Sequence, residues 1–333
     1  MLIIESYEVA VVLLIVTMLC WGSWANTQKL ATQKWPFQLF YWDYAFGIVL
    51  LSLIFGLTLG STGDAGRPFL TDLGQADAGA LWSAFIGGVV FNIANLLLVA
   101  AIDVAGMAVA FPVGIGLALV LGVVVNYVAT PLGDPVLLFF GVALVTLAII
   151  FDAIAYRRNS AGGAISRKGL LLSIIAGILM GFFFRFVAAS MSTDFARPEA
   201  GLLSPYSAMF VFSIGILISN FLWNSIFMYY PFQGEVTPYK DYFSKGTPRL
   251  HLIGLLGGLI WAVGMAFSLI ASEQAGFAIS YGLGQGATMV AALWGVFIWK
   301  EFADGPPGTN RLLLAMFICF ALGLGLIIIA RLN

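Results

Sequence analysis

The sequence carries very little charge for its length. Only 9% of its 333 residues are aspartate, glutamate, lysine or arginine, against about 25% in an average soluble domain. One histidine and two distant cysteines exclude any recognisable metal site and argue against a disulfide framework, so we expect no cofactor. The basic residues form no block, and nothing in the charge pattern favours a nucleic-acid partner.

Hydrophobic residues dominate the composition of the chain. They make up 61% of the chain, and the mean hydropathy is +1.00, which leaves too little polar surface for a water-soluble fold. A helix needs about 20 largely apolar residues to cross a bilayer, whereas a β-barrel would show shorter alternating strands. The sequence therefore predicts an all-α integral membrane protein with ten transmembrane helices, near residues 9–28, 38–60, 79–100, 105–129, 135–156, 169–190, 205–229, 251–271, 275–299 and 311–331.

Lysine and arginine are distributed unevenly between the two sides of these spans. Cytoplasmic loops carry an excess of both residues, and an even number of spans places both termini on one side. The predicted cytoplasmic loops hold Lys29, Lys34, Arg157, Arg158, Arg167, Lys168, Lys240, Lys245, Arg249, Lys300 and Arg311, and the opposite side holds Arg67, Arg197 and Arg331. We therefore expect a cell (inner) membrane protein with both termini on the non-cytoplasmic side.

Two segments of the chain resemble each other 170 residues apart. Residues 101–116 read AIDVAGMAVAFPVGIG and residues 271–286 read ASEQAGFAISYGLGQG, with identical residues at six of the 16 positions. Five spans per copy is an odd number, so the second copy crosses the membrane in the opposite sense, as in many secondary transporters. We predict inverted five-helix repeats at 1–156 and 169–333, joined by a short cytoplasmic loop at 157–168. Chance similarity between Gly- and Ala-rich helices is the alternative.

Three ionisable residues are predicted to lie at helix ends. Asp103 and Glu273 match in the repeat and fall at the expected starts of spans 4 and 9. An acid at that place caps free N–H groups and is stabilised by the helix dipole; contact with a gate is the alternative. His251, the only histidine, is expected at the cytoplasmic interface of span 8.

Four stretches of the chain resemble one transporter family. CWGSWANTQKL, YWDYAFGIVLLSLIFGLTLG, AVAFPVGIGLALVLG and ALWGVFIWKEF are similar, in this order, to the ureide permease and glucose/ribose porter branch of the drug/metabolite transporter superfamily. The resemblance implies a central cavity lined by spans 1–4 and 6–9. It also implies a small polar solute, such as a ureide, nucleobase or sugar, that moves together with protons. Plant ureide permeases have a long central loop with a Walker-type sequence, which residues 157–168 lack, so we expect no bound nucleotide.

Polar side chains inside the spans are costly to bury, so each is expected to have a partner or a function. Asp43, about 10 Å into span 2, is predicted to exchange protons or to make a structural hydrogen bond. Arg185 is predicted in the outer part of span 6. It would bind a carboxylate or carbonyl group of the solute or act as a gate charge; pairing with Asp194 or Glu199 is the alternative.

Two pairs of amides fall at helical spacing. Asn92 and Asn95 share a face of span 3, and Asn220 and Asn224 share a face of span 7. Amide groups offer donors and acceptors that suit a solute with N–H, C=O or O–H groups. Hydrogen bonds between helices are the alternative for both pairs.

Spans 1, 4 and 9 supply the remaining candidates. Trp21 and Trp24 share a face deep in span 1, where they would stack on a planar ring or sugar or pack against a neighbouring helix. In span 9, Tyr281 and Gln285 are assigned to solute contact. Hinges or close helix crossings are predicted at matching depths of spans 4 and 9, at Pro112, Gly114, Gly116, Gly282, Gly284 and Gly286.

These features predict a permease and not an enzyme. Neither H-E-x-x-H nor a serine or cysteine nucleophile with a histidine partner is evident. The expected activity is secondary active transport of a small polar solute by alternating access, driven by protons. An exporter of amphipathic or drug-like molecules from the same superfamily would have a more apolar cavity, and a passive channel would show unsaturable flux. Monomer and homodimer remain equally open.

Overall fold

The computed structural model describes residues 1–31, 35–159, 166–303 and 305–332. Lys34 and the middle of the predicted 157–168 loop lie outside these ranges. The elements are α1 (Tyr7–Ser23), α2 (Ala25–Ala31), α3 (Phe37–Leu57), α4 (Phe69–Gln75), α5 (Ala78–Ala105), α6 (Met107–Ala110), π-helix η1 (Phe111–Ile115), α7 (Gly116–Ala129), α8 (Pro135–Asn159), α9 (Arg167–Ser190), α10 (Pro205–Tyr229), α11 (Tyr239–Ser244), α12 (Pro248–Ala275), α13 (Phe277–Gly284), α14 (Ala287–Leu293), π-helix η2 (Trp294–Ile298) and α15 (Thr309–Ile329).

The described residues contain ten helical segments long and apolar enough to cross a membrane. The all-α fold class and the number of spans are therefore as predicted. The spans are Tyr7–Ala31, Phe37–Leu57, Ala78–Ala105, Pro112–Ala129, Pro135–Asn159, Arg167–Ser190, Pro205–Tyr229, Pro248–Ala275, Phe277–Ile298 and Thr309–Ile329.

Several spans begin at a polar residue that caps the helix. The side chains of Ser6, Ser166, Ser204 and Thr247 each accept a hydrogen bond from a backbone N–H in the first turn of α1, α9, α10 and α12. Such caps satisfy N–H groups that have no partner within the helix. In a membrane this matters more, because lipid offers no hydrogen bonds.

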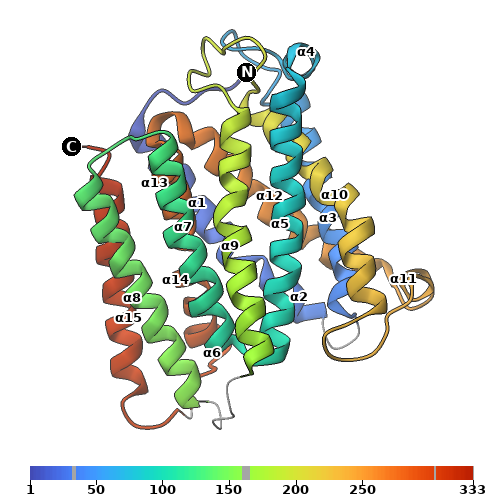
Figure 1. Ribbon diagram of the computed structural model, residues 1–333, viewed down its shortest axis with the longest axis vertical. Helices are drawn as coiled ribbons and strands as arrows, with labels where there is room; N and C mark the ends of the chain where they lie inside the picture. The colour runs from blue at the N-terminus through green and yellow to red at the C-terminus, as the bar shows by residue number, and fades with distance from the viewer. Residues whose placement is uncertain (32–34, 160–165, 304, 333) are drawn as a thin grey trace.

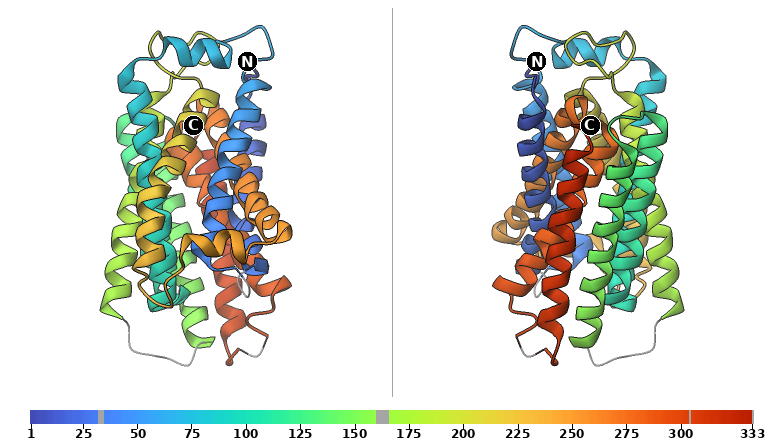
Figure 2. Two further views of the ribbon diagram at one scale, coloured as in Figure 1. Left: turned by 90° about the vertical axis from the view of Figure 1, so that its right-hand side faces the viewer. Right: turned by 90° about the vertical axis from the view of Figure 1, so that its left-hand side faces the viewer.

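The helices of the bundle stand upright, with both chain termini at the same end (Figure 1). We call this the upper end and the opposite one the lower end. Figure 2 shows α4 lying across the upper end and α8 standing beside α15 along one edge. α5 meets the short α6 at the lower end, whereas α12 meets α13 at the upper end (Figure 1).

α5 and α12 are matching elements of the two halves. Each has 28 residues, and each is followed by a glycine, Gly106 with φ 77° and Gly276 with φ 82°. A positive φ is available to glycine without a steric penalty, so the helices end here. The expectation that Asp103 and Glu273 begin the next spans is wrong. Both acids lie near the carboxyl ends of α5 and α12, because the breaks fall after them.

The same close crossing occurs once in each half. A Cβ added to Gly88 of α5 would lie 2.0 Å from the carbonyl oxygen of Phe212 on α10, and one added to Gly258 of α12 would lie 2.0 Å from that of Tyr44 on α3. Each long helix therefore packs on the second span of the other half. This exchange of partners is what two oppositely inserted copies of one unit would produce.

Spans 4 and 9 are both interrupted where the sequence contains the repeated glycines. Pro112 and Gly114 lie within the π-helical turn η1, and Gly116 begins α7. In span 9, α13 ends at Gly284 and α14 begins after Gly286. π-turns and broken helices leave backbone groups outside the regular helical ladder, and they are common at functional sites.

Candidate functional site

A cavity of about 160 Å³ lies between the two halves, in the middle of the bundle. It receives side chains from spans 1, 3, 4, 6, 8 and 9, and none from α3 or α10. Its lining residues are Trp21, Gly22, Trp24, Ala25, Phe91, Asn95, Leu98, Ile115, Met180, Phe183, Trp261, Gln285, Ala287, Thr288 and Ala291.

Aromatic rings form much of the cavity wall. Trp21 stacks on Trp261 with 5.8 Å between ring centroids, and its Nε1 donates a hydrogen bond of 3.2 Å to the Trp261 carbonyl oxygen. Phe91 lies 4.5 Å from the Trp261 ring, and Trp24 lies 4.8 Å from the Tyr44 ring. These contacts hold the rings in place around the cavity.

Three polar side chains interrupt this aromatic wall. Asn95 Nδ2 donates to the Tyr41 hydroxyl at 3.2 Å, which leaves the Asn95 carbonyl oxygen as an acceptor. Thr288 Oγ1 donates to the Gln285 carbonyl oxygen at 2.9 Å. The Gln285 side chain lies at the break between α13 and α14, where it lines the cavity. An apolar pocket with a few oriented polar groups is the usual form of a small-molecule site.

A larger cavity of about 460 Å³ adjoins the first one on its lower side and shares three lining residues with it. We call it the vestibule. Tyr156 lies in the last turn of α8. Figure 1 shows that α8 ends at the lower end of the bundle, so the vestibule lies toward that end. Its lining residues are Gly22, Ala25, Asn26, Gln28, Lys29, Val99, Ile102, Asp103, Tyr156, Ala291, Trp294, Gly295, Trp299 and Glu301.

Glu301 ties the two halves together in the vestibule. Lys29 Nζ lies 2.6 Å from one carboxylate oxygen of Glu301, and the Tyr156 hydroxyl donates to the other at 2.7 Å. The Lys29 and Glu301 side chains are 45% and 29% exposed, which shows that water reaches this region. Asp103 is also exposed and lines the same space.

Two of the predicted amides that lie outside the cavity hold helices together. Asn92 Nδ2 donates to the Ile216 carbonyl oxygen at 3.2 Å and to Ser219 Oγ at 2.8 Å, both on α10. Asn224 donates to the Gln38 carbonyl oxygen on α3 at 2.8 Å. Asn220 is fully buried, and its side-chain amide has no hydrogen-bond partner within the described residues.

Tyr281 and Arg185 also lie away from the cavity. The Tyr281 hydroxyl donates to the carbonyl oxygens of Ala118 and Met180, on α7 and α9, at 3.2 and 3.1 Å. Arg185 is half-buried on α9 and lines neither cavity. Within the described ranges no hydrogen bond or ion pair joins it to Asp194 or Glu199.

Asp43 lies apart from the cavity, close to the only histidine. Its carboxylate oxygens each lie 3.0 Å from His251 Nδ1, and one of them accepts a hydrogen bond from the Tyr242 hydroxyl. His251 and Asp43 are separated by 208 positions in the chain, and the sequence alone gave no sign of their contact. Across the described residues, no group of three His, Cys, Asp or Glu side chains is placed to hold a metal ion.

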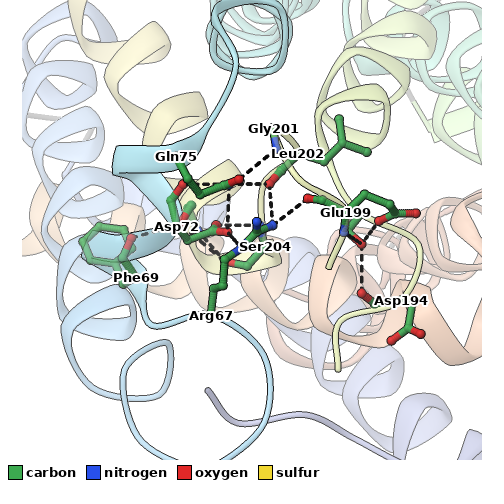
Figure 3. Close-up of polar contacts among 11 residues, drawn as sticks. Arg67, Phe69, Asp72, Gln75, Asp194, Glu199, Gly201, Leu202 and Ser204 are labelled. Atoms are coloured by element: carbon green, nitrogen blue, oxygen red, sulfur yellow. Dashed lines mark hydrogen bonds and ion pairs between the residues drawn. The ribbon is translucent and has the colours of Figure 1, made fainter. Parts of the chain in front are cut away.

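At the upper end, polar contacts join the loop around α4 to the loop between α9 and α10 (Figure 3). The buried Asp72 carboxylate accepts from Arg67 Nε at 3.0 Å and from the Ser204 backbone N–H at 2.7 Å. Arg67 also donates to the Glu199 carbonyl oxygen at 2.7 Å, and Gln75 donates to the Leu202 carbonyl oxygen at 2.9 Å. We call this set the upper clasp, because it connects the first half of the chain to the second.

Glu199 stiffens the loop that the clasp holds. Its carboxylate accepts hydrogen bonds from the hydroxyls of Ser192 and Thr193. The bond from Ser192 is the main reason why the pKa of the Glu199 carboxyl lies below its ordinary value of 4.5, since hydrogen bonds to a carboxylate favour its charged form.

Comparison with known proteins now identifies the family. A model of the ureide permease family matches residues 40–168 and 165–330, which together make up most of the chain. The chain belongs to the ureide permease family. As a ureide permease family member it is a multi-pass membrane transporter of small solutes.

Two relatives align with the chain over three quarters or more of their own lengths. Ureide permease 1 of Arabidopsis thaliana is 22% identical and aligns over 96% of each chain. The glucose uptake protein GlcU of Bacillus subtilis is 25% identical over 74% of this family member and 75% of its own length. One solved crystal structure superposes with a TM-score of 0.57 over 98% of this chain and 99% of that one, at 15% identity, so it shows a shared fold alone.

Four lining residues that carry this site were missed by the sequence reasoning. Phe91, Phe183, Trp261 and Thr288 line the cavity of this ureide permease family member, but in the sequence they read as ordinary membrane-helix residues. Trp261 offered one signal, because it lies in the middle of span 8, far from the interfaces where tryptophan gathers.

Proposed function

We propose that this protein is a secondary active transporter that moves a small polar solute by alternating access and couples its movement to protons. The central cavity supports this, because both halves of the chain contribute to its wall. A site placed between two repeats is exposed to either side of the membrane when the repeats tilt against each other.

The cavity wall favours a flat, polar solute. Trp21, Trp24 and Trp261 provide ring faces, while Asn95, Gln285 and Thr288 provide donors and acceptors. Ureides, nucleobases and sugars combine a face that stacks on an aromatic ring with N–H, C=O or O–H groups at the edge. The relatives named as ureide permease and glucose uptake protein support the same classes of solute.

The two ends of the bundle support an alternating cycle. The vestibule leads from the cavity toward the lower end, and the upper clasp joins the halves at the other. The lysine and arginine distribution supports a cytoplasmic position for the lower end. On that assignment the conformation faces inward, and both termini lie outside the cell membrane.

Export of amphipathic or drug-like molecules is a second candidate, which the apolar wall favours. Asn92, Asn220 and Asn224 do not line the cavity, so it is less polar than the amide pairs predicted. A single comparison separates the two candidates. A polar-solute transporter binds allantoin, uracil or glucose and ignores apolar amphiphiles, whereas an exporter shows the reverse preference.

Binding is tested first by thermal shift of the purified protein against ureides, nucleobases, sugars and amphiphiles. A ligand at 100 times its Kd adds about 2.7 kcal/mol of stability, a shift that is easily measured. Uptake into proteoliposomes with and without a proton gradient then tests coupling. Saturable uptake that a proton gradient drives supports the proposal, and unsaturable flux indifferent to the gradient contradicts it.

The roles of single residues are tested in the same assays. We assign solute contact to Trp21, Trp24, Asn95 and Gln285, and proton coupling to Asp43. Arg185→Ala is the test for Arg185: unchanged solute affinity in this variant removes the residue from the binding site.

A further inference from the structure

Asp43 and His251 form a close pair at the edge of the bundle, outside both cavities. The Asp43 side chain is 7% exposed and the His251 side chain 31%, so the carboxylate is buried while the imidazole meets water. The ring of Trp35 packs edge-on against His251 with 5.1 Å between centroids, and Tyr242 covers the imidazole at 4.6 Å. The acid is therefore largely shielded from water, and the histidine is the more exposed member of the pair.

The neighbouring elements leave little freedom around the pair. A Cβ on Gly254 of α12 would lie 2.5 Å from Asp43 Cβ, and one on Gly246 would lie 2.2 Å from His251 Nε2. The α11 helix supplies Tyr242, whose hydroxyl donates to Asp43. Burial raises the pKa of the Tyr242 phenol, and its bond to Asp43 adds to this effect. The phenol thus stays protonated and remains a donor.

Other ionisable groups near the pair have their own partners or face water. On α11, Asp241 pairs with Lys245 at 2.7 Å. Lys240 and Arg249 are exposed, and α3 offers only the phenols Tyr41 and Tyr44 besides Asp43. Asp43 and His251, with Tyr242 as a hydrogen-bond donor, thus form a separate polar cluster.

Of the two helices that carry the pair, α12 contributes Trp261 to the aromatic wall of the cavity, and α3 packs behind that wall. Tyr44 follows Asp43 on α3 and contacts Trp24, and Trp261 lies ten residues after His251 on α12, or about 15 Å along the helix. Between His251 and Trp261, the backbone of α12 touches the backbone of α3, where Gly258 meets Tyr44. A shift of one helix against the other at the pair therefore moves the cavity wall.

We propose that Asp43 and His251 act as one proton-binding site, which transmits its occupancy to the solute cavity through the α3–α12 contact. This inference rests on the proposed proton-coupled transport and names the group that binds the proton. Imidazole gains and loses a proton near neutral pH more readily than any other ordinary side chain. When the pair binds a proton, the positive imidazolium and the negative carboxylate cancel. When the proton leaves, the imidazole is neutral and the pair carries one negative charge.

That change of charge gives the coupling a physical cause. A net charge held away from water is costly, so the deprotonated pair favours an arrangement of α3, α11 and α12 in which Asp43 is better hydrated. The neutral pair favours the packed arrangement described above. One proton enters and the same proton leaves in each cycle, and no other chemical change is required.

The test uses protein freed of any affinity tag, reconstituted into proteoliposomes that contain a pH-sensitive dye. Allantoin, uracil and glucose serve as probes. Proton entry on addition of a probe is one readout, and exchange of labelled for unlabelled probe at equal pH is the other. His251→Gln and Asp43→Asn should each reduce probe-driven proton entry at least tenfold, while exchange stays within twofold of wild type. Asp241→Asn neutralises a carboxylate on the neighbouring α11 and should leave both readouts unchanged.

The outcomes separate this inference from the function on which it rests. If His251→Gln retains proton entry and Asp43→Asn loses it, Asp43 acts alone and the paired site is wrong. If both variants lose exchange as well, the pair is a structural ion pair and the inference is again wrong. Probe exchange without proton entry in the wild type overturns proton coupling itself, and absence of exchange for all three probes overturns the proposed solute class.

A second measurement keeps the inference testable if either variant fails to fold. The chain has a single histidine, so diethyl pyrocarbonate modifies one imidazole in the folded wild-type protein. Modification should block proton entry but not exchange, and hydroxylamine should restore it. Full modification with undiminished proton entry contradicts the proposal.

Discussion

Gln285 gives the most direct residue-scale test of the solute cavity. Its side chain lines the cavity, and replacement by leucine would remove a hydrogen-bonding group without a large change in volume. One hydrogen bond is worth about 0.5–1.5 kcal/mol, so we expect Gln285→Leu to weaken solute binding by up to about tenfold. Titration calorimetry with the best ligand of the thermal-shift screen measures this. Gln233→Leu in an exposed loop is the matched control, and equal affinities in both variants would place Gln285 outside the site.

Glu199 predicts a specific response to acid. The pKa of its carboxyl is lowered in the folded protein, so the charged group stabilises the fold above its unfolded pKa, and this contribution is lost as the pH falls through the folded value. We expect the melting temperature to fall below about pH 4.5, and to fall less steeply in Glu199→Gln, which cannot titrate. Parallel melting curves for the two proteins between pH 6 and pH 3 would contradict this assignment.

Single residues were the hardest part of the site to predict. Asn92 and Asn95 lie three positions apart, yet one joins two helices and the other lines the cavity. Composition shows that a buried amide needs a partner, but it does not tell which neighbour provides it. The contact of Asp43 with His251 shows the same difficulty, because two residues 208 positions apart meet only once the helices are placed.

At the scale of elements, the α3–α12 crossing depends on the absence of a side chain at Gly258. A Cβ there would lie 2.0 Å from a carbonyl oxygen, and backbone cannot move aside as a flexible side chain can. Overpacking of this kind costs about 1–3 kcal/mol. We therefore expect Gly258→Ala, and its counterpart Gly88→Ala, to lower the melting temperature clearly.

Gly79→Ala is the control for these variants. Gly79 also lies on α5, but nothing stands within 4 Å of an added Cβ, and alanine favours a helix by about 1 kcal/mol over glycine. This variant should be as stable as the wild type or more so. If all three variants melt together, the close crossings do not stabilise the bundle.

Elements were easier to predict than residues, since their limits follow from hydrophobic length. Ten apolar runs predicted ten spans, and the structure has them. The boundary between spans 3 and 4 was misplaced because Asp103 was taken as a helix start. The helix continues past this acid to Gly106, whose positive φ ends it. A single carboxylate near water interrupts a helix less effectively than a glycine.

At the scale of the whole molecule, the helix contacts agree with the repeat that we predict from 16 residues. α5 packs on α9 and α10, and α12 packs on α1 and α3. Each long helix therefore contacts the first two spans of the other half. The solute cavity does not share this symmetry, because Gln285 stands where the first copy has Ile115. In our proposal the shared architecture serves motion and the differing side chains serve recognition.

In our proposal, the upper clasp determines which end of the cavity is open. Asp72 is fully buried and joins Arg67 to the backbone of Ser204, and hydrogen bonds to a charged group are worth about 1.5–3 kcal/mol. Replacement by asparagine weakens these bonds on the closed side only, so we expect Asp72→Asn to shift the population toward the conformation open at the upper end, by about tenfold for each 1.4 kcal/mol lost.

A cysteine in the cavity wall reports this shift. We would place Thr288→Cys in a background with Cys20 and Cys319 replaced by alanine, and apply a membrane-impermeant thiol reagent to the face that carries both termini. Asp72→Asn should raise the labelling rate from this face about tenfold and slow labelling from the other face. Asp64→Asn, an exposed acid in the same upper loop, should change neither rate. Identical labelling in the two variants would mean that the clasp does not hold the upper end closed, because a contact that favours one conformation must change the ratio of the two when it is removed.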